Sequence, residues 1–385
     1  MGSLVQNQIS IDLLVPAQQI FHLDSKTTNT LLQGLNLVQY QALEGIVDTI
    51  WKHDEDLGRG YLLLSQSARA GRIWRWEVGG GPIAIGKTLH MDPSGCRSKH
   101  HPWRNCSTVA FGGSGGLAMD FGSKHTSAEG RLVLAEWGER RIVRMEESGA
   151  RTPLVILVPS ICSTDEAQGS HRRIYQPNSL LYTTYGDLII ADYDVDCQQA
   201  ALYYLDNAMA IPPLTSTLES RKAHEWNTTQ NHGVAVKIFF RAPGLTAIGG
   251  LALDLTWKGL YAMVQFGGTI QVLHLFLNDD DDEPLWDSRS EVVYEWNTAG
   301  EGATAPGPIV VDREGNLYAG FDQKLFLLTT QGTVVASLEL PARATSLTLG
   351  QDGFLYVSSA TDLYRIKVRS QPLKVPTNLV VKKKK

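Results

Sequence analysis

The first residues that could do chemistry form the sequence Gly-x-Ser-x-Gly at residues 112–116, which has the form of a nucleophile elbow. Such an elbow presents a reactive serine between a strand and a helix. Here the following Leu-Ala-Met-Asp at residues 117–120 has the alternation of a strand rather than the start of a helix. The pattern favours a turn that leads into a strand over a catalytic serine.

A second group is rich in zinc-binding residue types and consists of His90, Cys96, His100, His101 and Cys106. Zinc sites usually contain closely spaced pairs such as Cys-x-x-Cys or His-x₃-His, and this spacing contains neither. The group favours a polar loop over a zinc site. Loops of this kind on a rigid scaffold can still shape a binding site.

A third group is the acidic run at residues 278–283, which reads Asn-Asp-Asp-Asp-Asp-Glu. Carboxylates in this number could hold calcium, which prefers oxygen ligands. Like charges in a row more often mark a solvated hairpin tip, where they repel one another into water. We interpret the run as such a tip.

The composition is that of a globular protein, with 43% apolar and 19% charged residues in a chain of 385. The net charge of -5 gives no reason to expect a nucleic-acid partner. No apolar run approaches the roughly 20 residues that span a bilayer, and the N-terminal sequence does not read as a signal peptide. The four cysteines are too few for a disulfide framework in so long a chain. We therefore expect a reducing, cytoplasmic location.

The elements that must position any site are revealed by internal repetition. A short alternating apolar run ends at Asp or a turn residue, a Gly-containing turn follows, and two further apolar runs complete each copy. Alternation with period two and enrichment in aromatic and β-branched residues predict strands. The copies occupy residues 45–76, 117–145, 179–205, 251–273, 309–327 and 347–366.

Six copies of a small antiparallel sheet predict an all-β fold, a six-bladed β-propeller, because radial packing protects the strand edges. The alternatives are an open array and a β-sandwich. We predict one propeller domain over residues 41–370 and an N-terminal extension over residues 1–40, in which residues 19–23 give the outer strand that closes the ring. Residues 371–385 form a Lys-rich tail.

Several segments resemble the senescence-marker-protein/gluconolactonase family, which includes regucalcin-like proteins. They include Ala-Glu-Trp-Gly at residues 135–138, Pro-Asn-Ser at 177–179, Pro306 to Asp312, and Glu-Gly-Asn-Leu-Tyr at 314–318. Each motif is short, but together they follow the order of that family's blades. The resemblance covers residues 44–368 and implies a six-bladed propeller with hydrolase activity toward lactones.

The resemblance also implies one divalent cation, calcium or zinc, at the mouth of the central channel. The family's ligands are a Glu, two Asn and an Asp at the starts of several inner strands. Oxygen donors suit a hard cation, which would polarise a lactone carbonyl and lower the pKa of a bound water. A nearby carboxylate could then transfer a proton.

By position, Glu44 and Asn178 match two of these metal ligands, whereas Gly249 and Gly307 stand where the other two are expected. Glycine offers no side-chain donor, so the usual cation site is in doubt. Glu44 could also be a surface carboxylate beside a turn, and Asn178 a turn former after proline.

Other carboxylates could complete a partial site or act in catalysis. The candidates are Glu136 and Asp192, with Asp194 as a further possible ligand, although a carboxylate at the end of an inner strand often only caps a turn. Lesser family positions are also altered, since Gly115 replaces a common Asn, Trp137 a common His and Ser179 a common Asp.

Two hypotheses therefore follow. The first is a metal-dependent hydrolase of a lactone or related ester, with a small-molecule substrate, acting as a monomer. The second is a non-catalytic propeller that binds a small molecule or protein at the same face. The glycines at 249 and 307 favour the second hypothesis, and the retained Glu44 and Asn178 favour the first.

Overall fold

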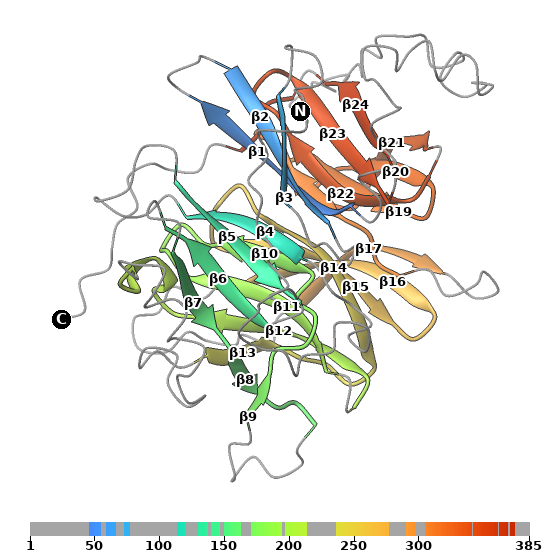
Figure 1. Cartoon of the computed structure of the whole chain (residues 1–385). Coiled ribbons are helices and arrows are strands. Elements are labelled where there is room, and N and C mark those ends of the chain that lie inside the picture. The colour runs from blue at the N-terminus through green and yellow to red at the C-terminus, as the bar shows by residue number, and fades with distance from the viewer. Residues whose placement is uncertain are drawn as a thin grey trace.

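The chain forms a six-bladed β-propeller in the computed structural model, and the blades follow one another around a central axis (Figure 1). The structure describes residues 46–54, 59–66, 73–77, 114–120, 130–137, 140–146, 150–162, 171–194, 197–213, 236–276, 290–297, 305–340, 342–360, 362–368 and 370–373. Within these residues each blade is an antiparallel sheet of three or four strands. The predicted fold class and blade number are confirmed.

Each blade begins with its inner strand. From the first blade to the sixth, the inner strands are β1 (Ile46–Asp54), β4 (Ser114–Asp120), β10 (Ser179–Tyr182), β14 (Leu245–Leu253), β18 (Ile309–Val311) and β22 (Ala344–Leu349). The second strands are β2 (Arg59–Gln66), β5 (Arg131–Glu136), β11 (Leu188–Asp194), β15 (Gly259–Phe266), β19 (Leu317–Phe321) and β23 (Phe354–Ser359).

The third strands are β3 (Ile73–Glu77), β6 (Arg141–Met145), β12 (Gln199–Leu205), β16 (Thr269–Phe276), β20 (Lys324–Leu328) and β24 (Leu363–Lys367). The described outer strands are β7 (Arg151–Val155), β13 (Val236–Phe240), β17 (Ser290–Asn297) and β21 (Val334–Glu339). The remaining elements are the hairpin of β8 (Leu157–Pro159) and β9 (His171–Arg173) and a 3₁₀ helix, η4 (Ala208–Ala210).

The hydrophobic core is divided among the interfaces between neighbouring blades. In β2, Leu62 and Leu64 pack toward the sixth blade, whereas Tyr61 and Leu63 pack toward the second. Successive side chains of a strand point to opposite faces, so a strand with a blade on each side is apolar at consecutive positions. The same division recurs at every interface around the ring.

The turn between the first two strands of a blade follows the predicted pattern of an aspartate and a glycine. In the fifth blade, Asp312 Oδ1 accepts the N–H groups of Glu314 and Asn316 at 2.9 and 2.8 Å. Gly315 lies between them with φ of 88°, a conformation that costs glycine little. The repeated Asp-and-Gly signature is thus a turn device that starts the second strand.

The ring closes between the first and last blades, which lie side by side in Figure 1 as blue and red strands. Thr49 in β1 donates its N–H to Ser346 Oγ in β22 at 3.0 Å. Trp51 stacks on Tyr356 of β23 with ring centroids 5.5 Å apart. These contacts join described strands of the two blades; the predicted closing strand at residues 19–23 lies outside the described residues.

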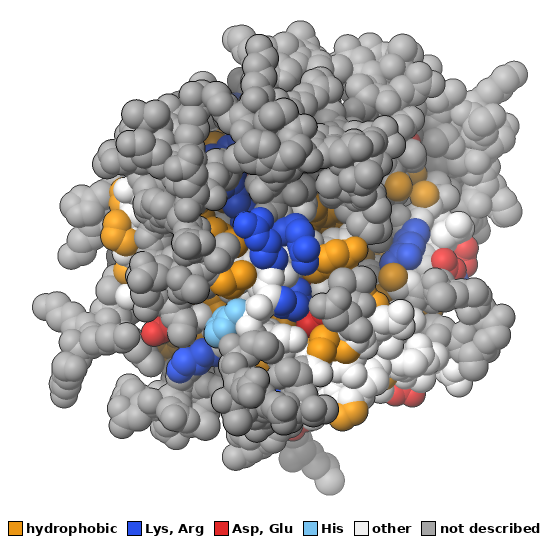
Figure 2. Space-filling view, turned by 60° about the horizontal axis from the view of Figure 1, so that its bottom comes forward, with side chains coloured by type: hydrophobic (Ala, Val, Ile, Leu, Met, Phe, Trp, Pro, Cys, Tyr) orange, Lys and Arg blue, Asp and Glu red, His pale blue; other side chains and the backbone are white. Residues whose placement is uncertain are grey.

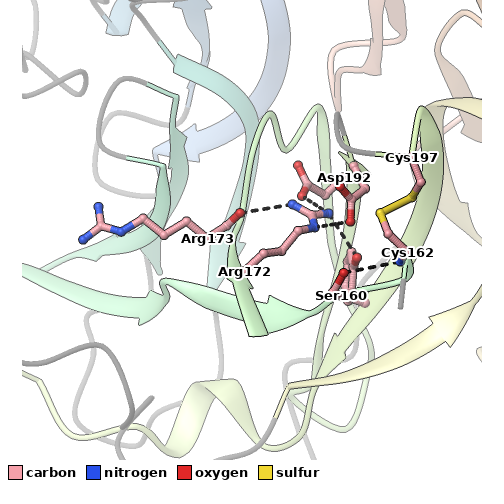
Figure 3. The surroundings of a disulfide bond; sticks show 8 residues. Ser160, Cys162, Arg172, Arg173, Asp192 and Cys197 are labelled. Atoms are coloured by element: carbon pink, nitrogen blue, oxygen red, sulfur yellow. Dashed lines mark hydrogen bonds and ion pairs between the residues drawn. A yellow bond between two sulfur atoms is a disulfide. The ribbon is translucent and has the colours of Figure 1, made fainter. Parts of the chain in front are cut away.

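A disulfide joins Cys162, which follows β8, to Cys197 in the turn between β11 and β12 (Figure 3). This pair was not predicted, because pairing across 35 residues cannot be deduced from one sequence. The bond fastens the segment carrying the β8–β9 hairpin to the third blade. Disulfides persist in oxidising compartments and are rare in the cytosol, so this bond argues against the expected reducing location.

Charged side chains are buried where the second blade meets the third. Arg144 Nε lies 2.9 Å from Glu146 Oε1, and its Nη2 donates to the carbonyl oxygen of Ile211 at 2.7 Å. Arg131 completes the group through Asp120 at 2.7 Å and Glu146 at 3.1 Å. Buried charges are tolerated only when paired, and here positive and negative groups balance. The network ties β5 and β6 to the segment after β12.

Several sequence predictions concern residues outside the described part of the chain, namely the Cys/His group at 90–106, the acidic run at 278–283 and most of the tail. Among the residues that are described, there is no helix with the length and apolar character that a membrane crossing requires.

Candidate functional site

A central channel of about 1500 Å³ runs between the inner strands of all six blades. Its walls are mainly apolar and come from residues such as Leu181, Leu251 and Val310. At one end, glycines of β4 and β14 lie beside the residues that precede the next inner strand: Gly116 N–H donates to Pro177 O at 3.3 Å, and Gly250 N–H donates to Gly307 O at 2.9 Å. We call this end the channel mouth. The channel is therefore a candidate site for a ligand.

Asp48 is the one carboxylate among the described residues that line the channel. Its Oδ2 accepts the N–H of Leu117 in the second blade at 2.7 Å. Its Oδ1 accepts the hydroxyl of Ser346 in the sixth blade at 2.8 Å and the N–H of Thr49 at 2.8 Å. The side chain therefore joins three blades while remaining partly exposed to the channel.

Burial raises the pKa of Asp48 to about 6, although the hydrogen bonds from Leu117, Ser346 and Thr49 oppose the change. A carboxyl group with such a pKa can take up or release a proton near neutral pH, which suits a general acid or base.

The stability of an Asp48→Asn variant is expected to depend less on pH than the stability of the unaltered protein. The carboxyl pKa is about 6 when folded and about 3.9 in an unfolded chain, so the folded state binds more protons between these values. The stability that Asp48 contributes is therefore complete below the unfolded pKa and declines as pH rises through 6. Asn does not titrate, although its single amide oxygen can accept only some of the hydrogen bonds that the two carboxylate oxygens accept.

Urea unfolding of both proteins across this pH range measures the effect. The unaltered protein should lose stability relative to Asp48→Asn as the pH rises. Parallel stability curves would contradict the assignment of a raised pKa to Asp48.

The structure describes one of the two predicted metal ligands, Asn178, and not the other, Glu44. Asn178 is exposed, lines the channel and lies directly before β10 at the mouth. Glu44 lies outside the described residues. The structure therefore places one of the two candidate ligands at the expected end of the channel and leaves the other as a prediction.

The glycines at the two remaining ligand positions are fixed there by close backbone packing. A Cβ atom on Gly249 would collide with the carbonyl oxygen of Gly307, and one on Gly307 would collide with the carbonyl oxygen of Gly320. A side-chain donor could not be restored at either position without moving neighbouring strands.

A cation faces this same part of the mouth. Arg343 precedes β22 and lines the channel, and its Nη2 donates to Ala305 O at 2.7 Å and to Pro306 O at 3.4 Å. The guanidinium thus lies beside Gly307, and its positive charge disfavours a second cation there. A divalent cation held by four side-chain oxygen donors does not fit these residues.

Glu136, a candidate catalytic residue, is fully buried at the end of β5. Its carboxylate accepts hydrogen bonds from Arg141 and, at 2.6 Å, from Arg151. Glu136 is not among the residues that line the channel. The surroundings explain this carboxylate as the partner of arginines in neighbouring strands of its own blade.

Asp192, the second candidate, is also buried and lies outside the channel lining. It accepts the N–H of Tyr175 at 3.0 Å and of Gln176 at 2.6 Å, and its Oδ2 lies 2.9 Å from Arg172 Nη2. Burial raises its pKa despite Arg172 and these N–H groups. Arg172 also contacts Asp194 at 2.6 Å, close to the disulfide (Figure 3). The two predicted catalytic carboxylates thus belong to separate ion-pair groups.

Further arginines surround these groups. Arg140 Nη2 and Arg172 Nη1 both donate to the carbonyl oxygen of Arg173, at 3.3 and 3.1 Å. Figure 2 shows a face of the molecule on which basic side chains gather near the centre.

Trp137 and Gly115, which stand where the family resemblance implies a His and an Asn, lie beside each other. Trp137 Nε1 donates to the carbonyl oxygen of Pro177 at 2.9 Å, and a Cβ on Gly115 would collide with Trp137.

Asp48 and Arg343 were not among the residues predicted from the sequence. A signal existed for Asp48, because it interrupts the apolar run Ile-Val-Asp-Thr-Ile at residues 46–50, and a charge in an inner strand requires partners. Arg343 has no comparable signal, since it stands between Ala342 and Ala344 in the connection that leads into β22.

Comparison with known proteins supports the fold. No family model matches the chain, and no curated protein sequence matches it. Among solved structures, a gluconolactonase from Xanthomonas campestris is similar with a TM-score of 0.54 and 17% identity, over 85% of this chain and 87% of that one. A luciferin-regenerating enzyme is similar with a TM-score of 0.51 and 15% identity, over 86% of this chain and 94% of that one. At these identities the similarity establishes that the chain has the β-propeller fold of gluconolactonase-like proteins.

Proposed function

We propose that the chain binds a small organic molecule in its central channel and that this binding does not depend on a divalent cation. The observation that carries the proposal is the channel itself, a cavity of about 1500 Å³ whose walls are mainly apolar with polar groups among them. Ligand sites in proteins are typically cavities of about 300–1,000 Å³ with this balance, so the channel has more than enough room for one small molecule. The packed glycines and Arg343 at the mouth support binding without the family's cation.

The test uses Thr348→Trp, which places a large side chain on the channel wall in β22. The matched control is Val335→Trp on the outer strand β21, where the side chain is 45% exposed. We expect metal-stripped protein to bind members of a panel of lactones, esters and organic acids in calorimetry. Thr348→Trp should lose this binding, and the control should keep it.

Two results would contradict the proposal. Binding that appears only after calcium or zinc is added would show that a cation is required. Binding that survives in Thr348→Trp at full strength would place the ligand outside the channel. Thermal unfolding of both variants confirms that they are folded.

Hydrolysis of a lactone or ester in the same channel is the second candidate function, and Asp48 favours it. A partly exposed carboxylate with a pKa near 6 could accept a proton from an attacking water. The fold shared with a gluconolactonase structure is consistent with this reaction but does not assign it. Metal-stripped protein should then hydrolyse a member of the panel, and Asp48→Asn should lose the activity. Activity that Asp48→Asn retains would exclude Asp48 as the base.

A further inference from the structure

The channel mouth carries a fixed positive charge. Arg343 lines the channel, and its hydrogen bonds to described residues are both made by Nη2, to the carbonyl oxygens of Ala305 and Pro306. These carbonyls hold the guanidinium plane in place without neutralising it. Burial lowers the pKa of Arg343, and the charge of Asp322 opposes this effect. A guanidinium that has lost part of its hydration gains from a bound anion.

The charges along the channel have the opposite sign to the protein as a whole. The described lining residues include Lys52, Arg313 and Arg343 but only one carboxylate, Asp48. The chain as a whole has a net charge of -5. A concave site lined by one sign of charge concentrates ligands of the other sign. The channel should therefore favour an anionic ligand over a neutral one of the same shape.

The mouth and the interior differ in chemistry along a single strand. Arg343 and Ser346 are separated by three positions, or about 10 Å of extended strand. Apolar residues from other blades, such as Leu251 and Val310, line the channel wall. This arrangement suits a ligand with an anionic group at one end and an apolar body.

We propose that the channel binds an organic carboxylate whose anionic group is held by Arg343 at the mouth, with its apolar part inside. This inference rests on the proposed function, because it names the ligand class of the same channel. Arginine suits the role, since its planar fork can donate two parallel hydrogen bonds to a carboxylate. A packed backbone and an arginine thus occupy the part of the mouth where the family resemblance implies cation ligands.

The test compares octanoate with octanamide, which has nearly the same shape and no charge, by calorimetry on metal-stripped full-length protein. We expect octanoate to bind about tenfold more tightly or better, because a charge-assisted hydrogen bond is stronger than a neutral one. Arg343→Gln should remove the difference between the two ligands. Arg343→Lys should retain part of it, and Arg365→Gln, at an exposed position outside the channel lining, should retain all of it.

The outcomes separate the two proposals. Equal binding of octanoate and octanamide by the unaltered protein, lost in Thr348→Trp, would overturn the role of Arg343 and leave the channel as the binding site. A preference for octanoate that persists in Arg343→Gln would also overturn it. Failure of octanoate to bind would overturn the role of Arg343, and only the failure of every member of the panel would contradict both proposals. Folding of the variants is checked by thermal unfolding, and Arg343→Lys serves if Arg343→Gln does not fold.

Discussion

Replacing Arg144 with methionine is expected to lower the free energy of unfolding by about 3–5 kcal/mol, the usual cost of removing one partner from a buried ion pair. The side chain is completely buried and contacts Glu146 at 2.9 Å and Asp120 at 3.4 Å. Without it, Arg131 alone would face both carboxylates, and one negative charge would remain uncompensated. The carbonyl oxygen of Ile211 would also lose its donor.

Urea unfolding followed by circular dichroism measures this loss. Arg365→Met is the matched control, because Arg365 is exposed in β24 and stacks on Phe354 at 4.9 Å. A second variant, Asp120→Asn with Arg144→Met, removes charge of both signs and should recover part of the loss, since residues in one network do not act additively. A loss below about 1 kcal/mol in Arg144→Met would show that the network contributes little.

Most of the fold could be predicted from the sequence because the determinants are local. Consecutive apolar residues such as Leu62 and Leu63 indicate a strand covered on both faces, and Asp312 with Gly315 indicates the turn that starts the next strand. The repetition of these features fixed the number of blades. The hairpin of β8 and β9 was not predicted, because its strands have three residues each and no repeated counterpart.

Less of the candidate site could be predicted, because its chemistry depends on residues that are distant in sequence. The place of Asn178 at the mouth followed from its position before an inner strand. The ion pairs that Glu136 and Asp192 form with arginines could not be predicted, because the sequence does not show which carboxylates face the channel. The hydrogen bond between Asp48 and Ser346 spans 298 positions and exists only because the ring closes.

The disulfide is the feature whose removal tests both the structure and the location of the protein. Cys162→Ser is expected to lower the free energy of unfolding by about 4 kcal/mol, because the bond closes a loop with a separation of 35 residues and so limits the unfolded chain. Cys197→Ser and the double variant should give the same loss, since each removes the same bond. Urea unfolding without reductant provides the comparison.

A reductant supplies the control within the same protein. Tris(2-carboxyethyl)phosphine should lower the stability of the unaltered chain to that of Cys162→Ser and leave the variant unchanged. If the reductant has no effect and the variant is as stable as the unaltered protein, the cysteines are unpaired and the expectation of a reducing compartment stands. If both lose stability as expected, the chain depends on a bond that a cytosolic protein would rarely form, and its location has to be sought in an oxidising compartment.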